Sequence, residues 1–198
     1  MNLIEFSKIA VSSKEELRDI VGFPHELIVK KSISIIDEKC KKFITASPMV
    51  FISTCNDRGE CDVSPRGDLG GCVKVLNEKQ LIIPDRIGNK KQDSNLNILS
   101  NPNIGLLFII PGIEDVLRVN GKATVIKDEE ILREMELEGN VPLLGIGIDV
   151  EEVFVHCPRA IGKSGIWNVE TWKNKEQVPT LLEIFHAHLK INGVDIPK

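Results

Sequence analysis

Between Met49 and Cys157 the chain is a series of short apolar segments of strand length, most of them separated by tight turn signals. One turn lies at 56–59, a second at 77–78, and Pro111-Gly112 precedes a longer segment. Tight turns join antiparallel neighbours, whereas parallel strands need a long crossover. The pattern therefore argues against a parallel βαβ stack and predicts an antiparallel sheet that closes into a small barrel, with helices packed outside.

The pattern predicts strands with a few short helices around them. The strand segments are Met49–Cys55, Glu60–Ser64, Cys72–Leu76, Gln80–Ile83, Ile104–Ile110, Val116–Ile126 and Leu144–Cys157. Periodicity and capping signals predict helices at the capping box Ser13–Glu16, over Ser34–Ala46, Asp93–Ser100, Asp128–Glu138 and Pro158–Ser164, and from Leu181 onward. Gly121, inside one strand, predicts a bulge or a sharp bend.

The composition argues against several classes of protein. A formal net charge of −4 does not suit a protein built to bind bulk nucleic acid, because such partners select for basic surfaces. No apolar run approaches the roughly 20 residues that span a bilayer, and the N-terminus lacks a basic start followed by an apolar core. We therefore expect a cytoplasmic protein with neither a membrane nor a nucleic-acid partner.

The five cysteines are scattered and include no Cys-x-x-Cys pair. This argues against a disulfide framework and a structural zinc site, and buried free thiols are the favoured interpretation. Cys55 and Cys61 flank the first turn, so they can face each other across a hairpin and become linked in an oxidising environment. His156 and Cys157 are adjacent on a predicted strand and point to opposite faces, so no metal site is predicted.

Cations and small polar residues gather near the ends of two predicted strands. The set is Ser64, Arg66, Arg86, Asn89, Lys90 and Lys91. If the two segments are neighbours in the sheet, these side chains converge, and their guanidinium, ammonium, hydroxyl and amide groups suit a phosphate ester. Two structural alternatives stay open. Lys90-Lys91 can be the solvated first turn of a helix, and the arginines can be ion-pair partners of Asp62, Asp68 or Asp85.

Several short segments, in their order along the chain, resemble the pyridoxamine 5′-phosphate oxidase-related family of FMN-binding split barrels. They are Asp62–Asp68 with its Ser-Pro-Arg-Gly-Asp run, Ile83–Lys91 with Pro-Asp-Arg-Ile-Gly-Asn, Asn97–Pro102, Gly105–Gly112, Leu117–Gly121 and Trp167. The resemblance covers about Ala46 to Trp167. Within the family, the chain is most similar to the branch whose members carry the first two segments. The resemblance implies a mainly β, single-domain split barrel with peripheral helices. It implies a helical segment at 1–45 that packs on the barrel and a flavin-binding core at 46–167, and we expect a C-terminal extension at 168–198 that is helical.

The resemblance implies noncovalent FMN binding at the interface of a homodimer, with residues of both chains touching the flavin. Asn89, Lys90 and Lys91 match the family's phosphate-binding Ser-Arg-Lys-like triplet, and Arg86 joins them at the phosphate. The other implied positions are Ser64, Pro65, Arg66, Pro84 and Asp85 along the flavin, Arg118 and Asn120 near ring or ribityl oxygens, and Trp167 at the flavin edge or the dimer interface. Alternatively, Arg118 faces solvent and Trp167 caps the core. No side chain is nominated as an acid or base.

The implied activity is an FMN-dependent oxidoreductase acting on an unidentified small molecule. Pyridoxamine phosphate itself is disfavoured as substrate, because the chain has no tyrosine, has Pro84 at the family's aromatic position, and closes with Asp195-Ile-Pro-Lys instead of Arg-Leu-x-Pro. Two alternatives remain. One is a nonenzymatic flavin carrier or sensor. The other is a relative that binds haem, through His156 or the C-terminal histidines, or a deazaflavin, which needs a longer groove.

Overall fold

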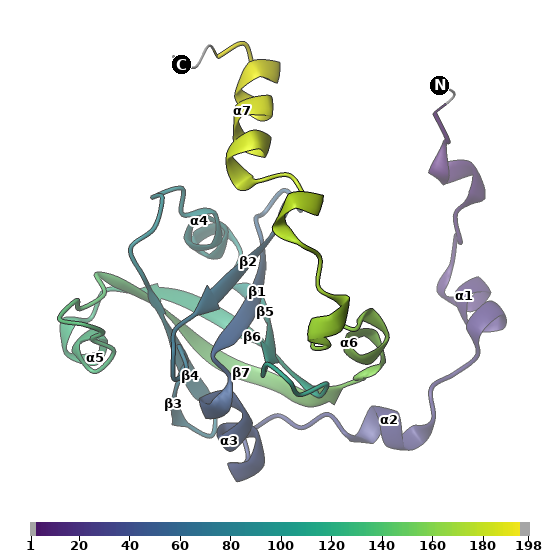
Figure 1. Cartoon of the computed structure of the whole chain (residues 1–198). Helices are drawn as coiled ribbons and strands as arrows, with labels where there is room; N and C mark the ends of the chain where they lie inside the picture. The colour runs from purple at the N-terminus through teal and green to yellow at the C-terminus, as the bar shows by residue number, and fades with distance from the viewer. Residues whose placement is uncertain (1–2, 195–198) are drawn as a thin grey trace.

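The computed structural model describes residues 3–194 and is built on one seven-strand antiparallel sheet of order β2-β1-β5-β6-β7-β4-β3 (Figure 1). The strands are β1 (Met49–Cys55), β2 (Cys61–Gly67), β3 (Lys74–Asn77), β4 (Gln80–Asp85), β5 (Asn103–Ile109), β6 (Val116–Ile126) and β7 (Leu144–His156). Each predicted strand is present within a few residues of its predicted ends, and the predicted antiparallel architecture is confirmed. The last four residues, where the sequence departs from the Arg-Leu-x-Pro ending, lie outside the described residues.

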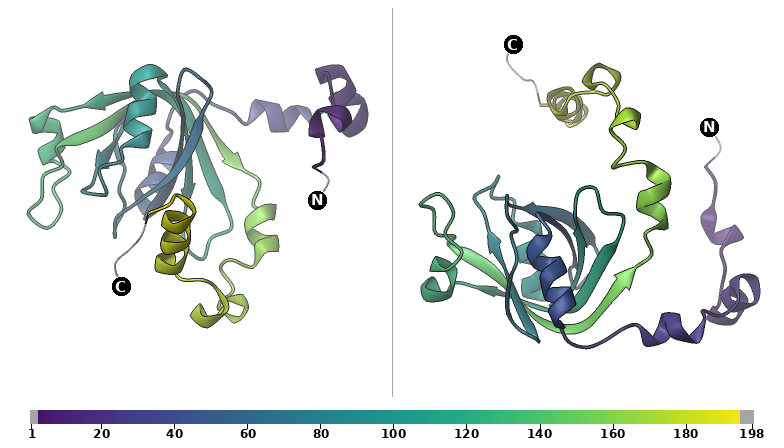
Figure 2. Two further views of the ribbon diagram at one scale, coloured as in Figure 1. Left: turned by 90° about the horizontal axis from the view of Figure 1, so that it is seen from above. Right: turned by 60° about the horizontal axis from the view of Figure 1, so that its bottom comes forward.

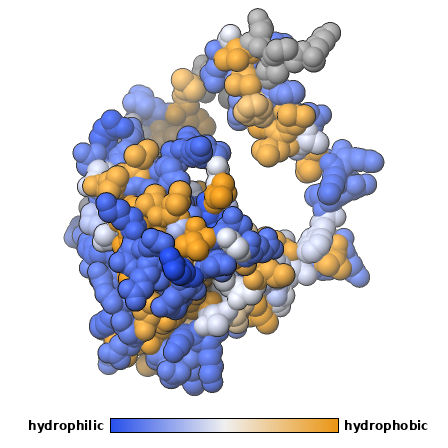
Figure 3. All heavy atoms as spheres, turned by 90° about the vertical axis from the view of Figure 1, so that its left-hand side faces the viewer, coloured by the Kyte–Doolittle hydropathy of each residue, from blue (hydrophilic) through white to orange (hydrophobic). Residues whose placement is uncertain are grey.

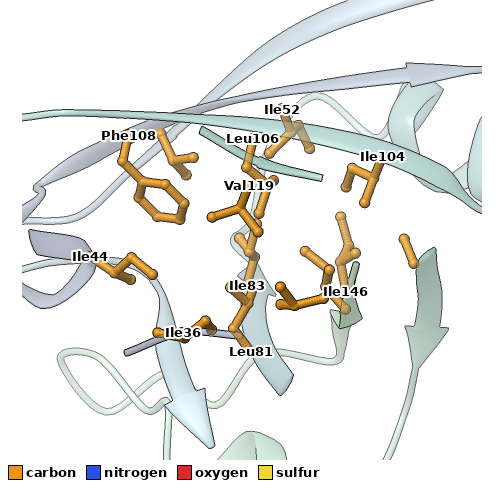
Figure 4. Close-up of a cluster of buried hydrophobic side chains, with 14 of the residues drawn as sticks. Ile36, Ile44, Ile52, Leu81, Ile83, Ile104, Leu106, Phe108, Val119 and Ile146 are labelled. Carbon is orange, nitrogen blue, oxygen red and sulfur yellow. The ribbon is translucent and has the colours of Figure 1, made fainter. Parts of the chain in front are cut away.

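The hydrophobic core lies inside the curved sheet (Figure 4). Alternate residues of β1 and β5 point inward, so Ile52, Leu106 and Phe108 are fully or almost fully buried. From the other half of the sheet, Leu81 and Ile83 of β4 meet them in one cluster. The period of two along these strands is the reason that one face of the sheet closes over a dry interior while the other stays accessible.

Helices pack outside the sheet at a few points. They are α1 (Lys14–Val21), α2 (Glu26–Lys30), α3 (Glu38–Ala46), α4 (Asp93–Ser100), α5 (Glu129–Arg133), α6 (Arg159–Ser164) and α7 (Leu181–Ile191), together with 3-10 turns at Phe6–Ile9, Val169–Thr171 and Lys175–Gln177. Helix α3 is shorter than predicted, because the Ile36 amide donates to Glu78 O at 2.7 Å and Asp37 caps the helix at the Cys40 amide. Helix α5 ends early, before Glu138 and Gly139 adopt positive φ. Helix α2 was not predicted.

Two arms extend from the barrel (Figures 1 and 2). In the N-terminal segment, α3 packs on the barrel through Ile44, whereas α1 and α2 bury none of their side chains. The C-terminal arm carries α7, which also buries none. No helix within residues 3–194 combines the length and apolarity needed to cross a membrane.

The predicted bulge is present in β6, where the register with β7 shifts between Asn120 and Gly121. A Cβ at Gly121 would stand 2.1 Å from the carbonyl oxygen of Asp149, so a side chain cannot be added without moving β7.

We expect Gly121→Ala to lower the free energy of unfolding by about 2 kcal/mol, measured by chemical denaturation. Gly147→Ala is the matched control, because its Cβ would make an ordinary 3.5 Å contact with Ile126. Equal losses in the two variants would contradict this explanation.

All five cysteines are free, and of these only Cys72 is buried, so the prediction of buried thiols is wrong for the exposed Cys61 and Cys157. The predicted facing of Cys55 and Cys61 is confirmed by their direct pairing between β1 and β2. Since the Asn56 amide donates to Glu60 O at 3.0 Å, the neighbouring cysteine pair is a non-hydrogen-bonded pair, the type in which side chains lie closest. The neighbouring Cys61 thiol raises the pKa of Cys55.

Oxidised glutathione is therefore expected to convert this pair to a disulfide, with two thiols oxidised and one glutathione disulfide reduced to two thiols. The thiol count should fall by two per chain, and mass spectrometry of a digest should join the peptides of Cys55 and Cys61. The closed loop is short, so the bond should stabilise the fold by only about 2 kcal/mol. In Cys61→Ser, oxidised glutathione should no longer lower the thiol count by two. If the count falls by two in that variant as well, the disulfide does not join Cys55 and Cys61.

Candidate functional site

A cavity of about 380 Å³ lies where the two halves of the barrel meet. Its walls are the end of β2, the end of β4, the 86–92 segment and the start of α4. Nine of the residues predicted from the sequence line it: Ser64, Pro65, Arg66, Pro84, Asp85, Arg86, Asn89, Lys90 and Lys91. The segments are not hydrogen-bonded neighbours in the sheet, because β2 and β4 lie on opposite sides of the strand order. They converge because the sheet curls until its two sides meet.

An ion pair joins the two sides of the sheet at this cavity. Arg86, directly after β4, donates from Nε and Nη2 to Oδ2 of Asp68 at 2.9 and 2.8 Å, and from Nη1 to the carbonyl oxygen of Met135 at 2.7 Å. Nine tenths of the Asp68 side chain is buried, and less than a third of the Arg86 side chain is exposed. The ion-pair alternative is thus the observed arrangement for Arg86, which crosslinks the closure of the barrel.

Arg66 is arranged differently. Its guanidinium donates to the carbonyl oxygen of Pro65 at 2.9 Å and to Oγ of the buried Ser94 at 3.4 Å, and it has no carboxylate partner among residues 3–194. Asp62, a possible partner by sequence, accepts instead from Nδ2 of Asn97 at 2.9 Å. Arg66 therefore presents a half-buried positive charge to the cavity.

The segment before α4 adopts unusual backbone conformations. Lys90 and Gln92 have φ of 63° and 62°, the left-handed region, while Lys91 between them does not. Two left-handed residues that both carry a Cβ are unusual in one short turn, and backbone strain of this kind is found most often at functional sites. The Asn89 side chain accepts from the Lys91 amide at 3.0 Å and holds the turn. Lys90 lies within the stretch that the sequence predicts to bind phosphate and Gln92 directly after it, whereas Glu138, which also has a positive φ, lies in the turn before β7.

The charges in this segment are only partly neutralised. Nζ of Lys91 lies 2.7 Å from Asp93, and the hydrogen bond between them raises the pKa of Lys91. Lys90 has no ion pair within the described chain. Asp85 accepts from the Gln92 side chain at 2.9 Å. Within residues 3–194 no side chain caps the N-terminus of α4, so the positive end of the helix also faces the cavity.

Sequence reasoning missed several residues of this site, and Gln92 and Ser94 are two of them. Both line the cavity, and Ser94 lies 3.4 Å from both Arg66 and Ser64 through its hydroxyl. Their position directly after the lysines, at the start of a predicted helix, was the available signal. The apolar wall is formed by Pro65, Pro84 and Cys72. Burial raises the pKa of the Cys72 thiol, so it packs as a neutral group.

Arg118 and Asn120 lie apart from this cavity, on the outer face of the sheet. They line a separate hollow of about 610 Å³ with Phe51 and Leu107. Nε of Arg118 donates to Asn120 at 3.2 Å, which in turn donates to Glu152 at 2.7 Å. Within one chain these two residues are therefore not brought together with the other predicted site residues.

Trp167 lines neither cavity. Its indole Nε1 donates to the carbonyl oxygen of Ile113 at 2.9 Å, which fastens the segment after α6 to the β5–β6 turn. Among residues 3–194, no group of three His, Cys, Asp or Glu side chains is placed to hold a metal ion.

The curled antiparallel sheet defines a split β-barrel protein, with a cavity lined by four cationic side chains where the barrel closes. The family model described as pyridoxamine 5′-phosphate oxidase matches residues 36–157, more than half of the chain, and the chain belongs to this family. Members of the family commonly bind flavin.

Solved structures share the fold. HupZ of Group A Streptococcus is 18% identical, with a TM-score of 0.50 over 61% of this chain and 93% of that one. A candidate pyridoxamine 5′-phosphate oxidase of Lactobacillus delbrueckii is 20% identical, with a TM-score of 0.50 over 62% of this chain and 95% of that one. A search of curated proteins gave no match.

Proposed function

We propose that the protein is a cytoplasmic, homodimeric flavoprotein that binds FMN noncovalently and uses it in oxidoreductase chemistry on a small molecule. The observation that carries the proposal is the charge balance of the cavity. Arg66 and Lys90 lack carboxylate partners in the described chain, and both face a cavity beside the uncapped N-terminus of α4. An anion in the cavity would neutralise these two charges, and a phosphate monoester is the anion that this donor set suits best.

The residues fit the parts of FMN in distinct ways. Lys90, Lys91 and the amides of the 89–92 turn suit the phosphate, with Arg66 next to them. The prolines and the Ser64 hydroxyl supply an apolar wall with one polar group, which suits the ribityl chain and ring. Arg86 acts through Asp68, holding the wall in place while adding to the positive potential. Bound flavin supplies the hydride or electron transfer, and these side chains bind and orient it.

The homodimer is supported by the outer face of the sheet. The exposed Val63 and the partly buried Phe51 and Leu107 line the hollow on that face, beside Arg118 and Asn120. Pairing two copies through this face would cover those side chains and bring Arg118 and Asn120 to a shared flavin. Apolar surface with a few polar groups at its centre is typical of such interfaces.

The test is to purify the protein and record its absorption spectrum. We expect flavin bands, release of FMN on heating, identified by mass, and a dimer mass in light scattering. A colourless protein that does not bind added FMN in a fluorescence titration would refute the proposal. Oxidation of reduced nicotinamide by the yellow protein would support an oxidoreductase, whereas tight binding without turnover would favour the flavin carrier.

A further inference from the structure

A second groove adjoins the phosphate cavity on the other side of the 86–92 segment. It has a volume of about 600 Å³ and is closed on its far side by the 137–144 segment that precedes and enters β7. The two cavities share five residues: Asp85, Arg86, Gly88, Lys90 and Gln92. A ligand can therefore continue from one cavity into the other across Lys90.

The groove is mainly apolar, and no other segment of residues 3–194 covers its exposed side chains. Ile87 and Leu143 are 91% and 87% exposed, and Leu137 is 40% exposed. On this side of the molecule, hydrophobic side chains interrupt a mainly hydrophilic surface (Figure 3). Aliphatic side chains held open to water on a concave wall are more typical of a ligand site than of a solvated loop.

The groove is held open by hydrogen bonds of its own wall. Leu137 and Asn140 exchange backbone hydrogen bonds of 3.1 and 2.9 Å, which close the turn at Glu138 and Gly139. Arg86 anchors the start of the same wall through the Met135 carbonyl oxygen. The wall is thus fixed to the residue that crosslinks the phosphate cavity, so the two sites are positioned by one set of contacts.

We propose that the groove binds the adenosine half of FAD, so that the protein takes the dinucleotide form of the flavin as well as FMN. This inference rests on the proposed function, because it places the flavin phosphate in the first cavity. The pyrophosphate then crosses the shared segment at Lys90, and the adenosine lies against Ile87 and Leu143.

Charge distinguishes adenosine from other tails that a flavin phosphate can carry. The wall at 137–144 together with Ile87 contains no lysine or arginine. Beyond Arg86 and Lys90 at the boundary with the first cavity, a polyanionic tail, such as the oligoglutamate of a deazaflavin cofactor, has no counterion in the groove. A neutral purine and ribose need apolar contact and a few polar groups, which the aliphatic side chains, Asn140 and Glu138 supply.

The test compares the dissociation constants of FMN and FAD for the full chain after removal of bound flavin, by fluorescence titration. We expect FAD to bind at least as tightly as FMN. Leu143→Glu should raise the dissociation constant of FAD by about tenfold, because apolar contact is lost and the new carboxylate repels the pyrophosphate. The dissociation constant of FMN should stay nearly unchanged. Leu99→Glu is the matched control, since Leu99 is also exposed but lies on α4 and lines neither cavity.

Each outcome decides the question. If FMN binds and FAD binds tenfold more weakly or not at all, the groove does not take adenosine, while the proposed function stands. If Leu143→Glu weakens both flavins equally, the residue supports the fold and not the tail. Tighter binding of an oligoglutamyl deazaflavin than of FAD would overturn the choice of adenosine. If no flavin binds, the proposed function fails and this inference with it.

Discussion

Replacing Arg66 by alanine is expected to weaken FMN binding by about a hundredfold and to leave the stability of the apoprotein nearly unchanged. Arg66 has no carboxylate to neutralise it in the described chain and makes only two neutral hydrogen bonds. Its charge is therefore available to an anion, and a charge-assisted contact with a phosphate at a half-buried site contributes about 3 kcal/mol. Titration with FMN and thermal unfolding of the apoprotein measure the two effects separately.

Arg58→Ala is the matched control for this prediction. Arg58 lies in the β1–β2 turn, lines neither cavity, and pairs with Glu60 at the surface. Because exposed ion pairs contribute little, this variant should keep both its FMN affinity and its stability. An Arg66→Ala protein that binds FMN as tightly as the parent would remove Arg66 from the site. A protein that unfolds several degrees earlier would indicate a structural role.

Much of the barrel was predictable because its signals are local. Most strands either alternate between apolar and polar residues or are continuously apolar. The turn at Asn56–Gly59 fixes one hairpin by its own hydrogen bonds. Where predictions failed, a distant contact decided the outcome. Helix α3 starts late because Ile36 pairs with Glu78, a residue from the β3–β4 turn. Pairing of that kind depends on how the sheet closes, which no local pattern contains.

The site shows the same limit more sharply. The sequence places Arg66 and Arg86 in similar turn contexts, each with aspartates nearby, so both were candidates for ion pairs and for phosphate contacts. The closed barrel places Asp68 beside Arg86 and turns Asp62 toward Asn97, which leaves Arg66 without a partner. Composition and spacing could predict a cationic cluster. Only the pairing in three dimensions shows that Arg86 crosslinks the barrel and that Arg66 is available to bind an anion.

Arg86→Ala is expected to have the largest effect on stability. It leaves the carboxylate of Asp68, nine tenths buried, without a counterion, and removes the donor to Met135. Breaking such a pair by removing one partner costs about 3 kcal/mol, because the remaining charge stays desolvated. We expect the midpoint of thermal unfolding to fall by about 10 °C, measured by calorimetry on the apoprotein.

A second substitution shows whether the unpaired charge is the cause. In Arg86→Ala, adding Asp68→Asn removes the buried charge and should recover about half of the lost stability, whereas two independent sites would give additive losses. Asp68→Asn alone should cost less than Arg86→Ala, because the freed guanidinium is more exposed and reaches water. If Arg86→Ala instead keeps its unfolding midpoint but no longer binds FMN, then Arg86 is a direct phosphate ligand and the crosslink is dispensable. The barrel closure would then depend on core packing alone.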